Sequence, residues 1–123
     1  MTAIAAPEAP VTTIRNRKAT TDFPLGKDSE GSQVVASVTS HHNKENRVLV
    51  AYVTRVAIKE SGTPGIVIRS SFPMDAVRVM TDPIGRYSDK ALASFHDDAM
   101  AAVEHYRDSQ ADSRLNAVFA PVA

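Results

Sequence analysis

Two stretches of alternating side chains, separated by a short polar segment, constrain the fold of this chain most. They are "QVVASVTSHH" (residues 33–42) and "RVLVAYVTRVAIK" (residues 47–59), with "NKEN" (residues 43–46) beginning the connection between them. Both stretches are rich in β-branched residues and alternate with a period of two, which is typical of β-strands. A short polar connection between two such runs favours an antiparallel hairpin. We therefore predict that a long hairpin forms the centre of the fold.

The two faces of this hairpin are assigned by pairing the more apolar set of side chains from each strand. This pairing directs the even-numbered residues of both strands towards one core. The opposite, open side then carries Ser37, Thr39 and His41 beside the odd-numbered residues of the second strand, which are Leu49, Ala51, Val53, Arg55, Ala57 and Lys59. Arg69, from the later stretch "GIVIRSSF", is expected on the same side. The prediction is an uncovered sheet face that carries cations and hydroxyl groups.

The remaining elements complete an α+β pattern. "VTTIRNRKAT" (residues 11–20) predicts a first strand, and "DFPLGKDSEGS" (residues 22–32) predicts turns. The strand that begins in "GIVIRSSF" should be interrupted at Pro73, which cannot donate to a ladder, and should resume to about residue 81. Helices are predicted at about residues 88–109, with Ser88 as N-cap, and at about residues 112–120. The expected fold is an antiparallel sheet followed by two C-terminal helices.

Apolar residues recur along both predicted helices at spacings of three and four. We expect these side chains to pack the helices onto the sheet of a dimer: Leu92, Phe95, Val103, Tyr106, Leu115 and Phe119. One long helix cannot cover a face of a sheet of this size. A second subunit is therefore expected to supply the missing cover, and homodimers are the commonest soluble oligomers.

Length and composition narrow the possible classes. A chain of 123 residues is expected to form one domain, here residues 11–123, preceded by an Ala/Pro-containing arm at residues 1–10. That arm lacks the basic and apolar regions of a signal peptide, and no apolar run approaches the roughly twenty residues that span a bilayer. The absence of cysteine excludes disulfides, thiolate catalysis and sulfur-ligated metal sites.

Candidate catalytic and metal-binding residues do not form a recognisable pattern. His41 and His42 are adjacent in a strand and should point to opposite faces, while His96 and His105 fall on opposite sides of one helix. His96 borders the apolar stripe and is expected to be a packing residue. No nucleotide-binding glycine motif or nucleophile motif is present. We therefore predict a protein that is not an enzyme and that needs no metal or cofactor.

The predicted open face favours nucleic acid as a partner. The formal net charge is zero, yet residues 1–80 carry ten Lys/Arg against seven Asp/Glu. Cations neutralise phosphates and hydroxyl groups hydrogen-bond to them. The candidate RNA-binding residues are Arg55, Lys59, Arg69, Ser37, Thr39 and His41. Tyr52 is assigned to the core side, so no base-stacking platform is predicted.

The order of these elements resembles the coat proteins of single-stranded RNA bacteriophages, the leviviruses and their relatives. The resemblance covers about residues 11–120 and is strongest over "VVASVTSHHNKENRVLVAYVTRVAI", followed by "ESGTPG", "IVIRSSFP", "VRVMT" and "SDKALASFHDDAMAAVEHYRDS". It implies a homodimer whose sheets join edge to edge, and whose helices reach over the partner. It further implies an icosahedral shell in the virion, assembled in the cytoplasm of a host bacterium, with single-stranded RNA on the open face. In the family, that face can also bind a repressor hairpin, but Leu49 and Ala51 stand where polar residues are expected, which favours packaging by charge.

Two other classes of protein share parts of this pattern. A small dimeric nucleic-acid-binding regulator would have the same basic face without forming shells. A dimeric α+β small-ligand module or enzyme would require His41, Arg55 and Arg69 to converge in a pocket.

Overall fold

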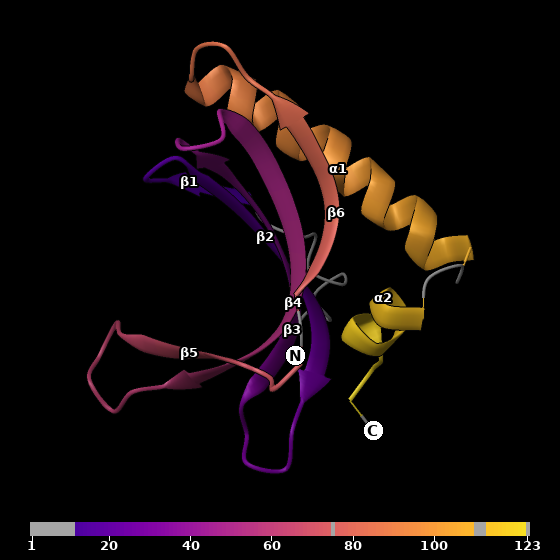
Figure 1. Cartoon of the computed structure of the whole chain (residues 1–123). Helices are drawn as coiled ribbons and strands as arrows, with labels where there is room; N and C mark the ends of the chain where they lie inside the picture. Colours follow the sequence, from indigo (N-terminus) through magenta and orange to yellow (C-terminus); the bar gives the residue numbers. More distant parts are fainter. Residues whose placement is uncertain (1–11, 75, 110–112, 123) are drawn as a thin grey trace, which may run out of the picture.

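The computed structural model describes residues 12–74, 76–109 and 113–122, which form a six-stranded antiparallel sheet followed by two helices (Figure 1). The strands are β1 (Thr12–Arg15), β2 (Lys18–Lys27), β3 (Gln33–Asn43), β4 (Val48–Glu60), β5 (Val67–Ser71) and β6 (Val77–Pro83). The helices are α1 (Asp89–Ser109) and α2 (Ser113–Phe119). This arrangement confirms the predicted α+β class. The predicted arm at residues 1–10 lies outside the described residues.

The long strand β4 organises the sheet. The strand order is β1-β2-β3-β4-β5, and β6 also pairs with β4, on the first half of the edge whose second half pairs with β5. Strands β5 and β6 therefore lie end to end along the same edge of β4, with a break between them. Pro73 lies in that break, so the interruption predicted from the sequence is confirmed.

The N-terminal part of the sheet differs from the prediction. The expected single strand over residues 11–20 is instead a hairpin of β1 and β2, which turns at Asn16 and Arg17. Both turn residues have positive φ values, 54° and 59°, as a two-residue turn of the mirror-image type requires. Strand β2 then continues through the segment predicted as turns, with a register shift between Pro24 and Gly26. The glycine and proline there mark a β-bulge rather than the end of a strand.

The face assignment of β4 was also wrong. Strands β3 and β4 pair with Ser37 opposite Thr54 and Ala36 opposite Arg55, so even-numbered residues of β3 share a face with odd-numbered residues of β4. The β4 residues that face the helices are therefore Leu49, Ala51, Val53 and Arg55. The connection from Lys44 to Arg47 contains an even number of residues, and this length sets the parity of the pairing.

Both helices pack on one side of the sheet, and no helix of the described residues covers the other side (Figure 1). The helix side buries two apolar clusters, in which α1 contributes Leu92, Phe95 and Val103 and α2 contributes Leu115 and Phe119. These five placements in the core are confirmed. Tyr106, near the end of α1, is 43% exposed in the single chain, so its packing onto the sheet of a dimer stays a prediction. No described helix combines the length and apolarity that crossing a bilayer requires.

The beginning of α1 and its attachment to the sheet rest on polar contacts. The Ser88 hydroxyl accepts a hydrogen bond from the backbone N–H of Ala91 at 3.0 Å, which confirms the predicted N-cap. Further along α1, His96 is buried, and its two ring nitrogens lie 2.8 Å from the Thr21 hydroxyl and 2.7 Å from the Ser40 hydroxyl. Both nitrogens are thus satisfied by neighbouring strands. His96 is a packing residue, as predicted, and it joins α1 to β2 and β3.

Candidate nucleic-acid interface

The uncovered side of the sheet, called the open face below, is defined by the strand registers. Cross-strand partners point to the same side, so one set of alternating residues from each strand forms this surface. Its members include Thr13 and Arg15 of β1, Lys18, Thr20 and Asp22 of β2, Ser37, Thr39 and His41 of β3, Val50, Tyr52, Thr54 and Val56 of β4, Arg69 and Ser71 of β5, and Arg78 and Thr81 of β6. These residues comprise four cations, seven residues with aliphatic hydroxyl groups and one carboxylate, and the registers add Lys27 and the carboxylate of Glu60 at strand ends on the same side. The predicted basic, hydroxyl-rich face is present, although several of its residues differ from those expected.

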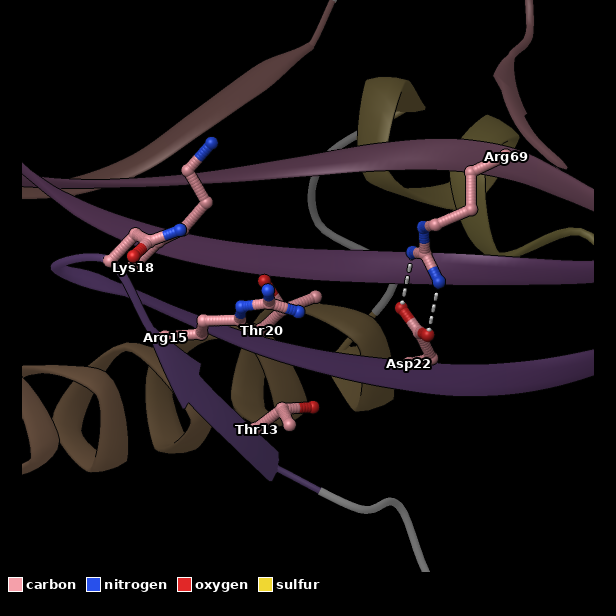
Figure 2. Close-up of a pocket in the computed structure, with 7 residues that line it drawn as sticks. Thr13, Arg15, Lys18, Thr20, Asp22 and Arg69 are labelled. Atoms are coloured by element: carbon pink, nitrogen blue, oxygen red, sulfur yellow. Dashed lines mark hydrogen bonds and ion pairs between the residues drawn. The ribbon is translucent and has the colours of Figure 1, made fainter. Parts of the chain in front are cut away.

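Two adjoining pockets occupy the part of the open face between β1 and β5. The larger has a volume of about 420 Å³ and is lined by Thr13, Arg15, Asn16, Lys18, Thr20, Asp22 and Arg69 (Figure 2). The smaller has a volume of about 260 Å³ and is lined by Lys18, Thr20, Ser37, Thr39, Thr54, Val56, Arg69 and Ser71. Lys18, Thr20 and Arg69 line both, so the two pockets form one continuous depression across the strands. Figure 2 views it with both helices behind the sheet.

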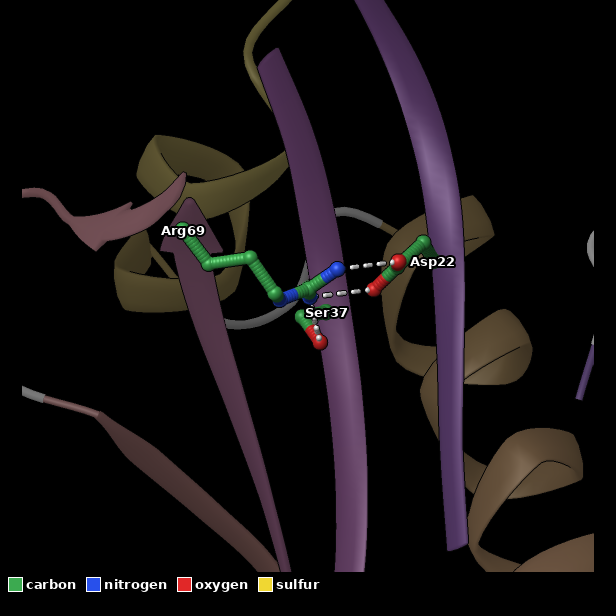
Figure 3. Close-up of polar contacts among 3 residues, drawn as sticks. All are labelled: Asp22, Ser37 and Arg69. Atoms are coloured by element: carbon green, nitrogen blue, oxygen red, sulfur yellow. Dashed lines mark hydrogen bonds and ion pairs between the residues drawn. The ribbon is translucent and has the colours of Figure 1, made fainter. Parts of the chain in front are cut away.

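Arg69 reaches across this depression to β2. Its guanidinium donates two hydrogen bonds to the carboxylate oxygens of Asp22, at 2.8 and 2.9 Å, and one to the Ser37 hydroxyl at 3.3 Å (Figure 3). Strands β4 and β3 lie between β5 and β2, so a flat sheet would separate the two residues by about 14 Å. An arginine side chain cannot bridge that gap together with the offset along the strands. The contact therefore requires a sheet that curves towards the open face.

The ion pair shifts the pKa values of both side chains. Burial alone would raise the pKa of the Asp22 carboxyl, but hydrogen bonds from Arg69 and Ser37 outweigh it, so this pKa lies below its ordinary value. The same hydrogen bond to Asp22 raises the pKa of Arg69. The pair is thus fully charged near neutral pH. The two side chains remain partly exposed, at 40% for Arg69 and 29% for Asp22, so solvent weakens the attraction between them.

An aromatic pair adds a different kind of surface to the open face. The rings of Tyr52 and His41 are stacked, with centroids 5.7 Å apart and planes inclined by 13°. Arg78 is the cross-strand neighbour of Tyr52 on β6. Planar rings beside a cation can stack on nucleotide bases while the cation neutralises the backbone. Tyr52 was predicted on the core side, so this surface was not expected; the even length of the β3–β4 connection was the signal that could have placed it.

Arg55 is not on the open face, where it had been predicted. It is 9% exposed, and its guanidinium donates hydrogen bonds to the backbone carbonyl oxygens of Val118, at 3.0 Å, and of Ala120. Its guanidinium carbon also lies 5.2 Å from the ring centroid of Phe72. The last carbonyl groups of a helix lack partners within the helix, and Arg55 satisfies them for α2. Its charge therefore serves the packing of α2 on β4.

The other predicted RNA-binding residues separate into two groups. Ser37, Thr39 and Arg69 line one pocket, and His41 lies further along the same face beside Tyr52. Lys59 is exposed near the end of β4, but it belongs to the odd-numbered set and therefore points to the side opposite Arg69. The lining residues that were not among the predicted RNA-binding residues are Thr13, Arg15, Asn16, Lys18, Thr20, Asp22, Thr54, Val56 and Ser71.

The described residues contain no group of three or more His, Asp or Glu side chains placed to hold a metal ion. On the open face, the carboxylate of Asp22 is already held by Arg69, and His41 is engaged with Tyr52. The arrangement provides cations, hydroxyl groups and an aromatic surface for binding an extended anion.

Comparison of the chain with models of protein families, with curated proteins and with solved structures found no match.

Proposed function

We propose that this chain is a structural capsid protein that dimerises, assembles into an icosahedral shell and packages single-stranded RNA on the open face of its sheet. The observation that carries the proposal is the open face itself. Arg15, Lys18, Arg69 and Arg78 are distributed over four strands of one curved surface and are interspersed with hydroxyl groups. A flexible polyanion suits such a surface because each phosphate can meet a cation and each ribose a hydroxyl group.

Single-stranded nucleic acid suits this face better than a duplex does. The Tyr52–His41 stack offers a planar surface for an unpaired base, and the adjoining pockets lie in a concave sheet rather than on a projecting helix. Base stacking on aromatic side chains is largely independent of sequence. These features favour packaging of RNA with limited sequence preference.

Self-association is supported by apolar surface and by strand edges that this chain leaves exposed. Ile66, Val67 and Ile68, around the start of β5, are each more than half exposed, at 55%, 54% and 51%. In the described sheet, the outer edges of β5 and β6 pair with no further strand. Exposed apolar strand edges are places where a second chain can add to a sheet. A second copy of the chain is the occupant that the resemblance to levivirus coat proteins favours.

The direct test is to express the protein alone in bacteria and purify it without nuclease. Negative-stain microscopy and size-exclusion chromatography should show uniform particles. The ratio of their absorbance at two ultraviolet wavelengths should indicate bound RNA. This RNA should resist added nuclease. A clean dimer over a range of salt and protein concentrations would contradict the capsid proposal. A dimer that still binds RNA would instead favour a nucleic-acid-binding regulator.

A matched pair of variants locates the RNA within that experiment. Lys18→Glu reverses a cation in both pockets, whereas Lys90→Glu reverses an exposed cation in the first turn of α1, on the helix side. The proposal expects Lys18→Glu to lower the RNA content of the purified protein and Lys90→Glu to leave it nearly unchanged. Equal effects of the two changes would move the RNA away from the open face.

A further inference from the structure

The open face contains an internal ion pair, Arg69 with Asp22, at the depression formed by the two pockets. Arg69 lines both pockets, and both arms of its guanidinium are directed at the carboxylate of Asp22 (Figure 3). Carboxylate and phosphate oxygens present similar pairs of acceptors to a guanidinium group, which binds either of them in a two-pronged manner. The Asp22 carboxylate therefore occupies the place of an anionic ligand.

We propose that Arg69 forms a phosphodiester site that Asp22 closes in the free protein, and that a phosphate of single-stranded RNA opens it by displacing the carboxylate. This inference rests on the proposed function, because it concerns the same face and the same class of ligand. It adds a residue that acts against binding: Asp22 competes with the RNA, so only an anion that gains further contacts can replace it.

The surroundings of the pair favour this exchange. Among the described residues that line the two pockets, Asp22 is the one acid, while Arg15, Lys18 and Arg69 are cations. An RNA strand with one phosphate beside Arg69 would also run past Arg15 and Lys18 and past the hydroxyl groups of Thr13 and Thr20, which line the same pocket. The existing pair is partly exposed, and partly exposed ion pairs are weak enough to be displaced.

Displacement also has a consequence for protons. In the free protein, hydrogen bonds from Arg69 and Ser37 keep the pKa of Asp22 low against the opposing effect of burial. After the exchange, the carboxyl group loses its hydrogen bonds from Arg69 and faces a phosphate, while Arg15 and Lys18 lie further along the same pocket. Its pKa therefore rises on binding, because a neighbouring negative charge disfavours the ionised form. Binding should take up a proton, so the affinity for RNA should increase as the pH falls.

The test compares Asp22→Asn with Asp98→Asn, which removes the same charge from an exposed position on α1. The affinity for a fluorescently labelled oligouridine is measured by anisotropy at one fixed salt concentration. Asp22→Asn frees Arg69 while preserving the shape of the side chain, and it should tighten binding about tenfold. Asp98→Asn should change the affinity by less than about twofold because it lies away from the open face.

A double variant separates a local effect from the general loss of negative charge. In an Arg69→Gln background, Asp22→Asn should no longer tighten binding appreciably, because the group that it frees is absent. The wild type gives a measurement that does not depend on folding of a variant: between pH 7 and pH 5, its affinity should rise more steeply than that of Asp22→Asn. An equal gain from Asp22→Asn in both backgrounds, or equal effects of Asp22→Asn and Asp98→Asn, would overturn the inference.

The outcomes distinguish this inference from the proposed function. If the wild type binds oligouridine and Lys18→Glu abolishes that binding, RNA does use the open face, and an unchanged affinity of Asp22→Asn would overturn the Asp22 inference alone. If neither the wild type nor Asp22→Asn binds at low salt, both proposals are wrong.

Discussion

The guanidinium of Arg55 donates a hydrogen bond to the carbonyl oxygen of Val118 at 3.0 Å, which joins the centre of β4 to the end of α2. The side chain also bonds the carbonyl of Ala120 and is almost fully buried. Arg69 has the opposite setting, since it is partly exposed on the open face and paired with Asp22. The two arginines therefore have different roles, although the sequence predicted the same role for both.

The first prediction contrasts these two arginines. Arg55→Met removes hydrogen bonds to the end of α2 and leaves carbonyl groups without a partner, so the free energy of unfolding should fall by about 2 kcal/mol. Arg69→Met should change that free energy by less than about 1 kcal/mol, because it removes a partly exposed ion pair. Denaturant titrations measure both. A loss of RNA binding without loss of stability in Arg55→Met would contradict the assigned role.

The second prediction concerns the aromatic surface. Tyr52→Leu removes the ring that stacks on His41, so binding of single-stranded RNA should weaken by about 1–3 kcal/mol. Tyr52→Phe keeps the ring and serves as the control, with an affinity close to that of the wild type. Anisotropy titrations with oligouridine measure both variants. An equal loss in the two would assign the effect to the hydroxyl group instead of the ring.

The third prediction concerns the pH dependence of stability. Burial lowers the pKa of His96, which Asp97 only partly offsets, whereas the unfolded chain has the ordinary value of about 6.5. As the pH falls below about 6.5, the unfolded state takes up the proton more readily than the folded state. The contribution of His96 to the free energy of unfolding is therefore complete above about pH 7 and is lost below about pH 6.5. Thermal or denaturant unfolding from pH 8 to pH 5 should show this loss. His96→Gln should flatten the profile, and His105→Gln, at an exposed position on the same helix, should retain it.

The fourth prediction concerns the apolar side of α1. Phe95 is buried against the sheet, so Phe95→Ala should cost about 3–5 kcal/mol of stability through lost packing and the cavity that remains. Tyr106 lies on the same helix but is 43% exposed, and Tyr106→Ala should change stability by about 0.5 kcal/mol or less. A large loss in Tyr106→Ala would show that another subunit buries this residue, and dilution should then reduce the stability of the wild type as well.

The α+β class, the two helices and the core positions on them could be predicted because their signals are local. The apolar residues from Leu92 to Val103 recur with the spacing of an α-helix, and Ser88 marks where that helix begins. Burial on one side of a single helix follows directly from such a pattern.

The faces of β4 could not be predicted from hydrophobicity because both of its alternating sets begin apolar. Leu49 and Ala51 are no less suited to a core than Val50 and Tyr52, so the pattern did not decide which set faces the helices. The length of the connection decided it. The observed register differs by one residue from the predicted one, which places Arg55 on the helix side and Tyr52 on the open face.

The bridge between Asp22 and Arg69 was beyond sequence reasoning for a different reason. The two residues are 47 positions apart and lie on strands that are not neighbours in the sheet. Their contact depends on the curvature of the whole sheet, for which the local pattern contains no signal.

Mapping where RNA contacts the protein tests the central claim most directly. The protein is expressed alone, the RNA that purifies with it is cross-linked by ultraviolet light, and the modified peptides are identified by mass spectrometry. Cross-links should concentrate at Tyr52 and His41 and in the peptides that contain Lys18 and Arg69, all on the open face. Cross-links confined to the exposed side of α1, or protein that purifies without RNA, would contradict the claim that this face packages RNA.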